Sequence, residues 1–372
     1  MLSNHANLMK IVSNGKTAKL RNRHVISATV QSPKESKHSV KYEVLDKPKP
    51  KLKPGNVFTL AGRNFISELL QIGPDLGRAL GLRKEADAQS APRCFDFTLS
   101  NRGIREYELD HPAPGKEDAP VLVEVLYNTI VFLLDNVFEN RAVERFWLLE
   151  TVARMPYFAY SSCLHLYETL GWWRTAELRK IHFAEEWNEM HHLLIMETLG
   201  GNARWSDRFL AYHAAIVYYW ILVVCYLFSP KTSYKFSEML ETHAVSTYRQ
   251  FLIENKEKLK QMPAPEIAVQ YYSTGDLYLF HAAADLARAA TGEEMRRPPV
   301  DNMYDIFSNI LEDEWEHVKT MVMCQDYETL DELVGVDSII NLEETDQPNP
   351  GVRAKWKQWA DSMQSREASF FT

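Results

Sequence analysis

The sequence predicts an all-α fold built around a ferritin-like four-helix bundle, and two observations carry that prediction. From Ala119 to about Gln325, long apolar-patterned segments alternate with proline and glycine breaks, which is typical of helices joined by short loops. Within these segments a glutamate, a Glu-x-x-His, a second glutamate and a second Glu-x-x-His follow one another. A bundle that binds metal in its core uses this order, because residues three apart share one helix face.

Six helices are expected in this region, and prolines or glycines separate most of them. The pair Gly200-Gly201 ends the second helix, and Pro230 precedes the fourth. Their predicted ranges are 142–170, 175–199, 206–228, 233–256, 266–290 and 301–325.

The chain divides into four zones by composition. Residues 1–34 contain no acidic residue, six lysines or arginines and many hydroxyl groups, which is typical of a plastid or mitochondrial transit peptide. A disordered basic arm is the alternative. Residues 35–118 are predicted as an arm and linker with a Pro/Lys run at 47–54 and short helices within 64–83, broken at Gly73-Pro74. The bundle spans 119–326, and 327–372 form an acidic tail.

Composition excludes some classes of protein. The net charge of -8 over 372 residues argues against nucleic acid as a partner. The four cysteines are too scattered for a disulfide framework or a zinc ribbon, so we expect buried, reduced thiols. They are Cys94, Cys163, Cys225 and Cys324.

The helix at 206–228 suggests contact with a membrane. It has no charged residue from Ala214 to Phe228, a length that approaches a transmembrane span. Its aromatic residues are spread along the helix instead of gathering at its two ends. We therefore expect a monotopic protein whose helix lies with one side on the bundle and one side on lipid. A true span is the alternative.

The repeated motif predicts a metal centre that reacts with oxygen. Oxygen-rich ligation with one imidazole per metal suits iron or manganese better than zinc. Two further Glu-x-x-His pairs, Glu35/His38 and Glu108/His111, are set aside because neither lies on a convincing helix. Surface ion pairs are the alternative explanation for the retained residues. These are Glu150, Glu189, His192, Glu241, Glu314 and His317.

Several segments resemble the alternative oxidase family, and most closely its plastid branch, the plastoquinol oxidases. They include Arg145–Thr151, Tyr167–Arg174, Trp187–His192 and Asp313–His317, and the similarity covers about residues 120–326. The doubled His191-His192 is similar to the plastid branch. Trp315 departs from that branch, which has a small residue at this position.

The resemblance implies a role for each matched residue. The six retained residues would bind two iron ions, and Tyr248 would be a redox-active tyrosine beside them. Asn188 and Asp313 would orient the ligands through hydrogen bonds. Tyr226 matches a plastid-branch position implicated in activity and is predicted to help bind the substrate. The quinol pocket would be lined by Arg145, Leu149, Ala244 and Thr247.

The resemblance also implies an activity and a location. Two plastoquinols would be oxidised for each O2 reduced to two waters, without proton pumping, by a homodimer on the stromal face of the thylakoid membrane. Three alternatives stay open: a ubiquinol-using mitochondrial alternative oxidase, another di-iron enzyme such as a hydroxylase or desaturase, and a ferritin-like iron store.

Overall fold

The structure is a computed structural model that describes residues 55–79, 97–114, 116–174, 176–273 and 298–326. Over these ranges all regular secondary structure is helical, apart from one isolated bridge between Pro263 and Asn302. The predicted all-α class is therefore confirmed. The proposed transit peptide, the Pro/Lys run and the acidic tail lie outside the described residues.

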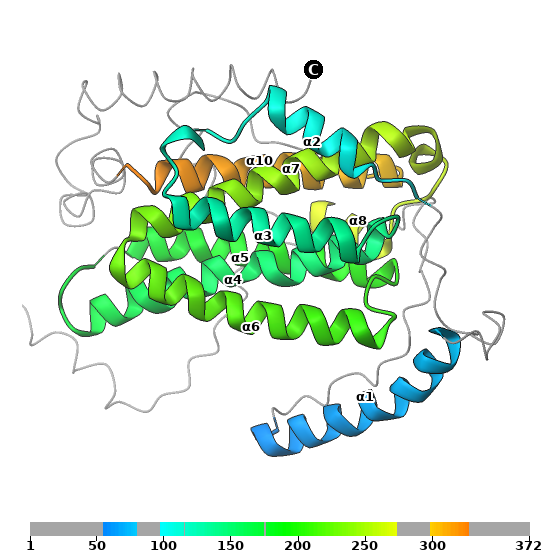
Figure 1. Cartoon of the computed structure of the whole chain (residues 1–372), viewed down its shortest axis with the longest axis horizontal. Helices are drawn as coiled ribbons and strands as arrows, with labels where there is room; N and C mark the ends of the chain where they lie inside the picture. Colours follow the sequence, from blue (N-terminus) through cyan, green and yellow to red (C-terminus); the bar gives the residue numbers. More distant parts are fainter. Residues whose placement is uncertain (1–54, 80–96, 115, 175, 274–297, 327–372) are drawn as a thin grey trace, which may run out of the picture. The chain divides into compact units, whose positions relative to one another are not determined.

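The predicted helices of the bundle are present with nearly the predicted bounds (Figure 1). The helix expected at 266–290 begins at Glu266 and is described only as far as Ser273. The observed helices are α4 (Ala142–Thr169), α5 (Ala176–Thr198), α6 (Trp205–Phe228), α7 (Pro230–Lys260), α8 (Glu266–Ser273) and α10 (Met303–Met323).

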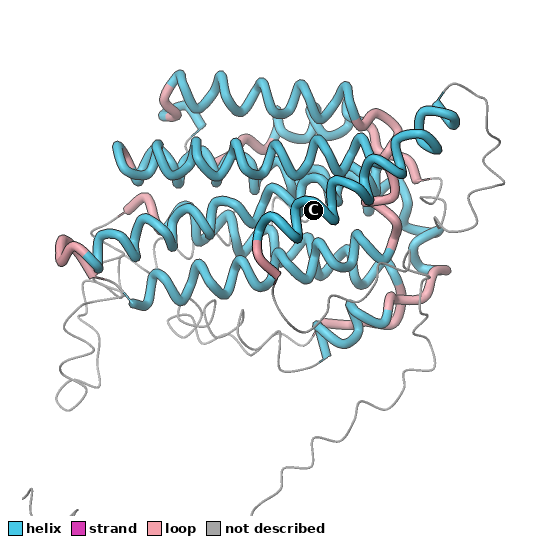
Figure 2. Tube along the Cα trace, turned by 90° about the horizontal axis from the view of Figure 1, so that it is seen from below, coloured by secondary structure: helices cyan, strands magenta, loops and turns pink. Residues whose placement is uncertain are grey.

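Four of these helices form the bundle. α4 packs against α5 and α7, and α10 packs against the same two helices, so the four close a ring around a common core. Figure 2 shows that the long helices run side by side. Local sequence fixes where two of them begin: Ser229 and Pro230 start α7, and Asn302 with Asp305 forms a capping box for α10.

Two more helices cover the bundle. α3 (Val121–Val137) packs on α7, and α6 packs on α4 and α7. The buried residues of α6 from Ala211 onward recur at helical spacing and are apolar or aromatic, whereas the outward face of the helix is apolar and exposed. By length and composition alone α6 could cross a membrane. Its buried face consists of Ala211, Ala215, Tyr218, Leu222 and Tyr226.

The N-terminal arm differs from the prediction in two places. α1 (Val57–Ala79) runs through Gly73-Pro74 as one helix, so the predicted break is wrong. Contacts with α6 hold both sides of the proline: Glu68 binds Arg208, and Asp75 accepts from the backbone N–H of Trp205 at 2.8 Å. These anchors compensate for the backbone hydrogen bond that Pro74 cannot donate.

The second difference is a helix that the sequence analysis did not expect. α2 (Asn101–Asp110) begins where the Ser100 side chain accepts from the backbone N–H of Gly103, and it packs on α7. Glu108 therefore does lie on a helix. It belongs to no metal-binding group among the described residues and instead contacts His243 of α7.

Candidate metal centre

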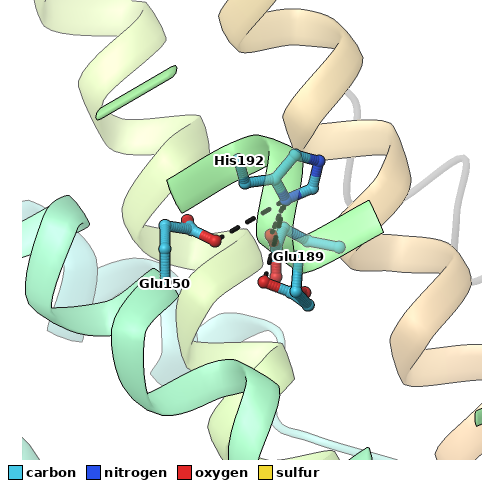
Figure 3. A group of neighbouring side chains, drawn as sticks. Glu150, Glu189 and His192 are labelled. Atoms are coloured by element: carbon cyan, nitrogen blue, oxygen red, sulfur yellow. Dashed lines mark ion pairs between the residues drawn. The ribbon is translucent and has the colours of Figure 1, made fainter. Parts of the chain in front are cut away.

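The six predicted ligands meet in the core of the bundle, and each is at most 4% exposed. α4 contributes Glu150, α5 contributes Glu189 and His192, and α7 contributes Glu241; α10 contributes the remaining pair, Glu314 and His317. Figure 3 shows the first three with their side chains directed toward one another.

These residues form two overlapping groups, each able to hold one cation. Within each group one ligand atom per residue lies within 4.8 Å of all the others. Glu189 and Glu314 belong to both groups, so they are placed to bridge two adjacent cations. Each cation position would then also have one terminal carboxylate and one imidazole. The first group is Glu150, Glu189, His192 and Glu314; the second is Glu189, Glu241, Glu314 and His317.

The polar atoms of this core form few hydrogen bonds with one another, and a bound cation would satisfy them better. Within the described ranges, one oxygen of Glu150, both oxygens of Glu189 and one oxygen of Glu314 are buried without a hydrogen bond of good geometry. The two imidazoles approach these oxygens: Nδ1 of His192 lies 3.2 Å from Glu314 Oε1, and Nδ1 of His317 lies 2.6 Å from Glu189 Oε1. Burying an uncompensated carboxylate is costly, and a bound cation is the usual compensation. Carboxylate-rich sites with imidazole favour iron or manganese among biological metals.

The pKa values of the buried carboxyl groups also indicate that the site lacks a positive charge. Burial and then the nearby Glu314 hold the pKa of Glu189 well above its ordinary value, and Glu241 has the same two leading causes. Burial, followed by Glu150, raises the pKa of Glu314 to about 7. A divalent cation reverses these effects, because it favours the ionised carboxylates.

The two histidines differ in their surroundings. Burial lowers the pKa of His317 to about 3, which leaves its imidazole neutral and available to a metal. Burial also opposes the charging of His192, but hydrogen bonds to Asp313, Glu150 and Glu314 hold its pKa well above the ordinary value. A metal at this site would displace the proton that these acids retain on His192.

Asp313 fixes the orientation of His192. The Nδ1 atom of His192 faces the carboxylates, 3.2 Å from Glu314 Oε1, while its Nε2 lies 3.1 Å from Asp313 Oδ2. The same Asp313 oxygen accepts from Asn188 at 3.1 Å and from Tyr272 at 2.8 Å. An Nε2–H directed at Asp313 leaves the Nδ1 lone pair free for a cation. The structure thus joins Asn188, Asp313 and His192 in one hydrogen-bond network, and their role in orienting a metal ligand stays a prediction.

Two tyrosines contact the terminal carboxylates in a reciprocal arrangement. Tyr248 follows Glu241 by seven residues on α7 and donates to Glu150 of α4. Tyr157 follows Glu150 by seven residues on α4 and donates to Glu241 of α7 at 3.0 Å. Tyr248 was predicted from the sequence, whereas Tyr157 was not. The repeated Glu-x6-Tyr spacing would have revealed both, because seven residues return to the same helix face.

The predicted quinol-pocket residues lie mostly on facing helices. Arg145 and Leu149 are on α4, and Ala244 and Thr247 are on α7. The buried Arg145 guanidinium joins the two sets, because its Nη2 lies 3.0 Å from Nε2 of His243.

Arg145 is the centre of a wider polar network. Its Nη1 donates to Asp135 at 3.1 Å and to Asn101 at 2.6 Å, while His243 Nδ1 lies 2.6 Å from Glu108. Burial lowers the pKa of Arg145, and the neighbouring Asp135 opposes that shift. The sequence analysis missed Asp135, His243 and Glu108, since α2 and α3 supply the acids from outside the motif-bearing helices.

Tyr226 does not lie with the predicted quinol-pocket residues on α4 and α7. It lies on α6 in a separate buried cluster, where its ring centroid is 5.2 Å from Tyr160 and 5.5 Å from Tyr234. Trp315, the departure from the plastid-branch pattern, is buried in the main core beside the bundle residues.

Comparison with known proteins identifies the family. The family model described as alternative oxidase matches residues 119–326. "Ubiquinol oxidase 4, chloroplastic/chromoplastic" of Arabidopsis thaliana is 51% identical over 222 residues, covering 60% of this chain and 61% of that protein.

Mitochondrial relatives are less similar. "Ubiquinol oxidase 1b, mitochondrial" of Oryza sativa subsp. japonica is 34% identical over 144 residues, covering 37% of this chain and 41% of that protein. "Alternative oxidase 3, mitochondrial" of Glycine max is 32% identical over 154 residues, covering 40% and 47%. The chain thus spans less than two thirds of the length of these relatives. Because the family model covers more than half of the chain, the protein belongs to the alternative oxidase family.

Proposed function

We propose that this protein is a quinol oxidase that uses two iron ions to reduce O2 to two waters with electrons from two plastoquinols. One observation carries the proposal: two four-residue groups of carboxylates and histidine share Glu189 and Glu314 at the centre of an alternative oxidase bundle. Bound there, an iron pair would supply the binding and reduction of O2, which protein side chains cannot carry out without a cofactor.

The chain's own residues hold and move protons around the proposed iron pair. Glu150 accepts the hydrogen bond of Tyr248, so it can take the phenolic proton when Tyr248 gives up an electron. Burial is the main cause that holds the pKa of Tyr248 well above its ordinary value, so the phenol stays protonated until it is oxidised. We propose that Tyr248 supplies one electron in this way. Phe146 stacks on its ring, with centroids 4.2 Å apart, and keeps water away.

Arg145 is proposed to bind the quinol. It is a fixed, buried cation one helical turn before Leu149 on α4, and His243 lies against its guanidinium. His243 and Glu108 form a hydrogen-bonded pair that can accept the proton a quinol hydroxyl releases. Ala244 and Thr247 flank this pair on α7 and are proposed to line the same pocket.

The exposed apolar faces of α3 and α6 support membrane attachment from one side. Phe132 of α3 is 65% exposed, and Trp220 of α6 is 61% exposed. Such a concentration of exposed apolar side chains marks an interaction surface. We propose that both helices lie in one leaflet, as in a monotopic protein, and that lipid-soluble plastoquinol enters from there. No transmembrane path for charge is invoked, so the proposed reaction pumps no protons.

The location of the protein is part of the proposal. The relative from Arabidopsis thaliana is named chloroplastic/chromoplastic, and residues 1–34 have the composition of a transit peptide. We therefore propose a plastid protein on the stromal face of the thylakoid membrane, acting as a homodimer.

Oxygen uptake by membranes that carry the recombinant chain tests the proposed function. Addition of decyl-plastoquinol should start uptake that cyanide does not inhibit and that the Glu241→Ala variant lacks. Uptake with decyl-ubiquinol but not with decyl-plastoquinol would favour the mitochondrial type of substrate. No uptake with either quinol, from iron-loaded protein bound to the membrane, would refute the oxidase and favour a di-iron hydroxylase.

A further inference from the structure

A second buried tyrosine with its own proton acceptor lies away from the metal ligands. The hydroxyl of Tyr234, at the start of α7, is 2.9 Å from Nε2 of His182 on α5. On the other side of the same ring, Nδ1 of His182 is 3.2 Å from Oε2 of Glu185. All three side chains are at most 2% exposed. None of them belongs to either proposed metal-binding group.

This arrangement suits coupled transfer of an electron and a proton. A carboxylate can only accept a hydrogen bond, so Glu185 places the imidazole proton on Nδ1 and leaves Nε2 as an acceptor for the Tyr234 phenol. Burial, followed by the neighbouring Tyr226, holds the pKa of Tyr234 well above its ordinary value. Tyr234 therefore stays protonated and can be oxidised only if a base takes its proton. His182 is that base, and Glu185 stabilises the charged imidazolium.

Aromatic rings connect this group to the metal centre. Tyr157, which donates to the ligand Glu241, has its ring centroid 6.1 Å from His182. The ring of Tyr160 lies 5.3 Å from His182 and 4.5 Å from Tyr234. Rings at these distances are close enough for an electron to move between side chains.

The same series of rings continues to the surface. Tyr226 lies 5.5 Å from Tyr234 by ring centroid, and their hydroxyls are 3.4 Å apart. Tyr167 follows at 6.3 Å from Tyr226, and Trp172 follows at 6.1 Å from Tyr167. Trp172 is 71% exposed. Tyrosine and tryptophan are among the most easily oxidised side chains, and they make up this entire outer part of the series.

We propose that Tyr234 is a redox-active residue that stores an oxidising equivalent, with His182 as the acceptor of its proton. Tyr234 loses one electron and becomes a neutral phenoxyl radical, while its phenolic proton moves to Nε2 of His182. The electron reduces an oxidised Tyr157, which recovers the proton that it released on its own oxidation. A later electron from quinol restores Tyr234, and His182 returns the proton.

The source of the oxidising equivalent rests on the proposed function. It arises when O2 is reduced at the metal centre while fewer than two quinols are available. Moving it to Tyr234 keeps it away from the ligands and Tyr248, where oxidative damage would end activity. The site itself, with its acceptor and its rings, depends only on the geometry described above.

Electron paramagnetic resonance tests the proposal in two ways on the full-length, iron-loaded protein. In the first, Tyr234 is replaced by 3,5-difluorotyrosine, and the protein reacts with O2 under limiting decyl-plastoquinol before freezing. In the second, photo-generated ruthenium(III) tris-bipyridine oxidises the same protein from solution without O2. We expect a tyrosyl signal with fluorine coupling in both experiments. We also expect it to fall to background in His182→Gln, which keeps a hydrogen-bond acceptor but removes the base.

The two experiments separate this proposal from the proposed function. If O2 is not consumed but light generates the fluorine-coupled radical, the redox site stands and the oxidase fails. If O2 is consumed normally but the tyrosyl radical lacks fluorine coupling in both experiments, the proposal is overturned. A radical on the neighbouring Cys324, or an unchanged signal in His182→Gln, also overturns it. Labelling position 248 in the same way provides the matched control for assigning the radical.

Discussion

Replacement of Asp313 by asparagine should weaken metal binding without unfolding the protein. Asp313→Asn keeps the size of the side chain but removes its negative charge. The Oδ2 atom of Asp313 accepts from three donors in the structure: His192, Asn188 and Tyr272. An asparagine oxygen can still accept these bonds, but as a neutral acceptor it holds the Nε2–H of His192 more weakly.

The expected magnitude follows from these three bonds. A hydrogen bond to a charged group contributes roughly 0.5–1 kcal/mol more than a neutral one, so three such bonds lose about 1.5–3 kcal/mol. Since about 1.4 kcal/mol corresponds to a tenfold change, Asp313→Asn should weaken metal binding by roughly 10- to 100-fold. Losses of about this size are usual when a residue that orients a metal ligand is replaced.

A competition titration measures the effect. Metal-free protein is titrated with Fe(II) under anaerobic conditions against a coloured chelator, for the wild type, Asp313→Asn and the control Glu312→Gln. Glu312 is the preceding residue on α10 and is exposed, so the control removes the same charge away from the site. Circular dichroism of the metal-free proteins checks that each is folded. An Asp313→Asn affinity within about twofold of the control would refute the proposed orienting role, since even one lost charged bond predicts more.

Three further predictions concern the fold, its ionisation and the membrane face. The melting temperature of metal-free protein should fall as the pH rises from about 5 to about 7: burial raises the pKa of Glu314 from 4.5 to about 7, so over this range the folded protein still binds a proton that the unfolded chain has lost, and each rise in pH favours the unfolded chain. A flat or rising profile in calorimetry would contradict this. Gly201→Ala should lower the free energy of unfolding by about 1–3 kcal/mol in denaturant titration, because its new Cβ would lie 2.4 Å from Cβ of Trp147. An unchanged free energy of unfolding would contradict this prediction and would show that α4 can shift away from the added methyl group at no cost. Val217→Lys should reduce flotation with liposomes, whereas Ile253→Lys, 56% exposed on α7, should not; equal loss in both would exclude α6 as the specific membrane face.

Sequence was sufficient for the residues whose spacing repeats within a helix. The Glu-x-x-His pairs on α5 and α10 and the long apolar segments determine both the helices and their inward faces, because the period of 3.6 residues links spacing to direction. Asn188 and Asp313, each directly before a glutamate of the carboxylate–histidine cluster, were also selected from the sequence. In the structure one oxygen of Asp313 accepts from both Asn188 and Nε2 of His192.

The residues that sequence missed come from contacts between distant segments. Glu108 contacts His243, 135 residues later, and no local spacing predicts such a pair. His182 and Tyr234 are likewise 52 residues apart and meet only because α5 and α7 share the core. The helix break that the sequence predicted at Pro74 is absent for a similar reason. Hydrogen bonds from α6 to both sides of Pro74 outweigh the tendency of proline to end a helix. Tyr157 differs, because the reciprocal Glu-x6-Tyr spacing was present in the sequence.

The iron content of each chain tests the central claim most directly. Mössbauer spectroscopy of protein loaded with 57Fe, combined with elemental analysis, measures how many iron ions bind and whether they are coupled. We predict two coupled iron ions per chain in the wild type. Glu189→Ala should lose the coupled pair, because Glu189 belongs to both groups of ligands. One isolated iron per chain, or an unchanged coupled pair in Glu189→Ala, would contradict the account.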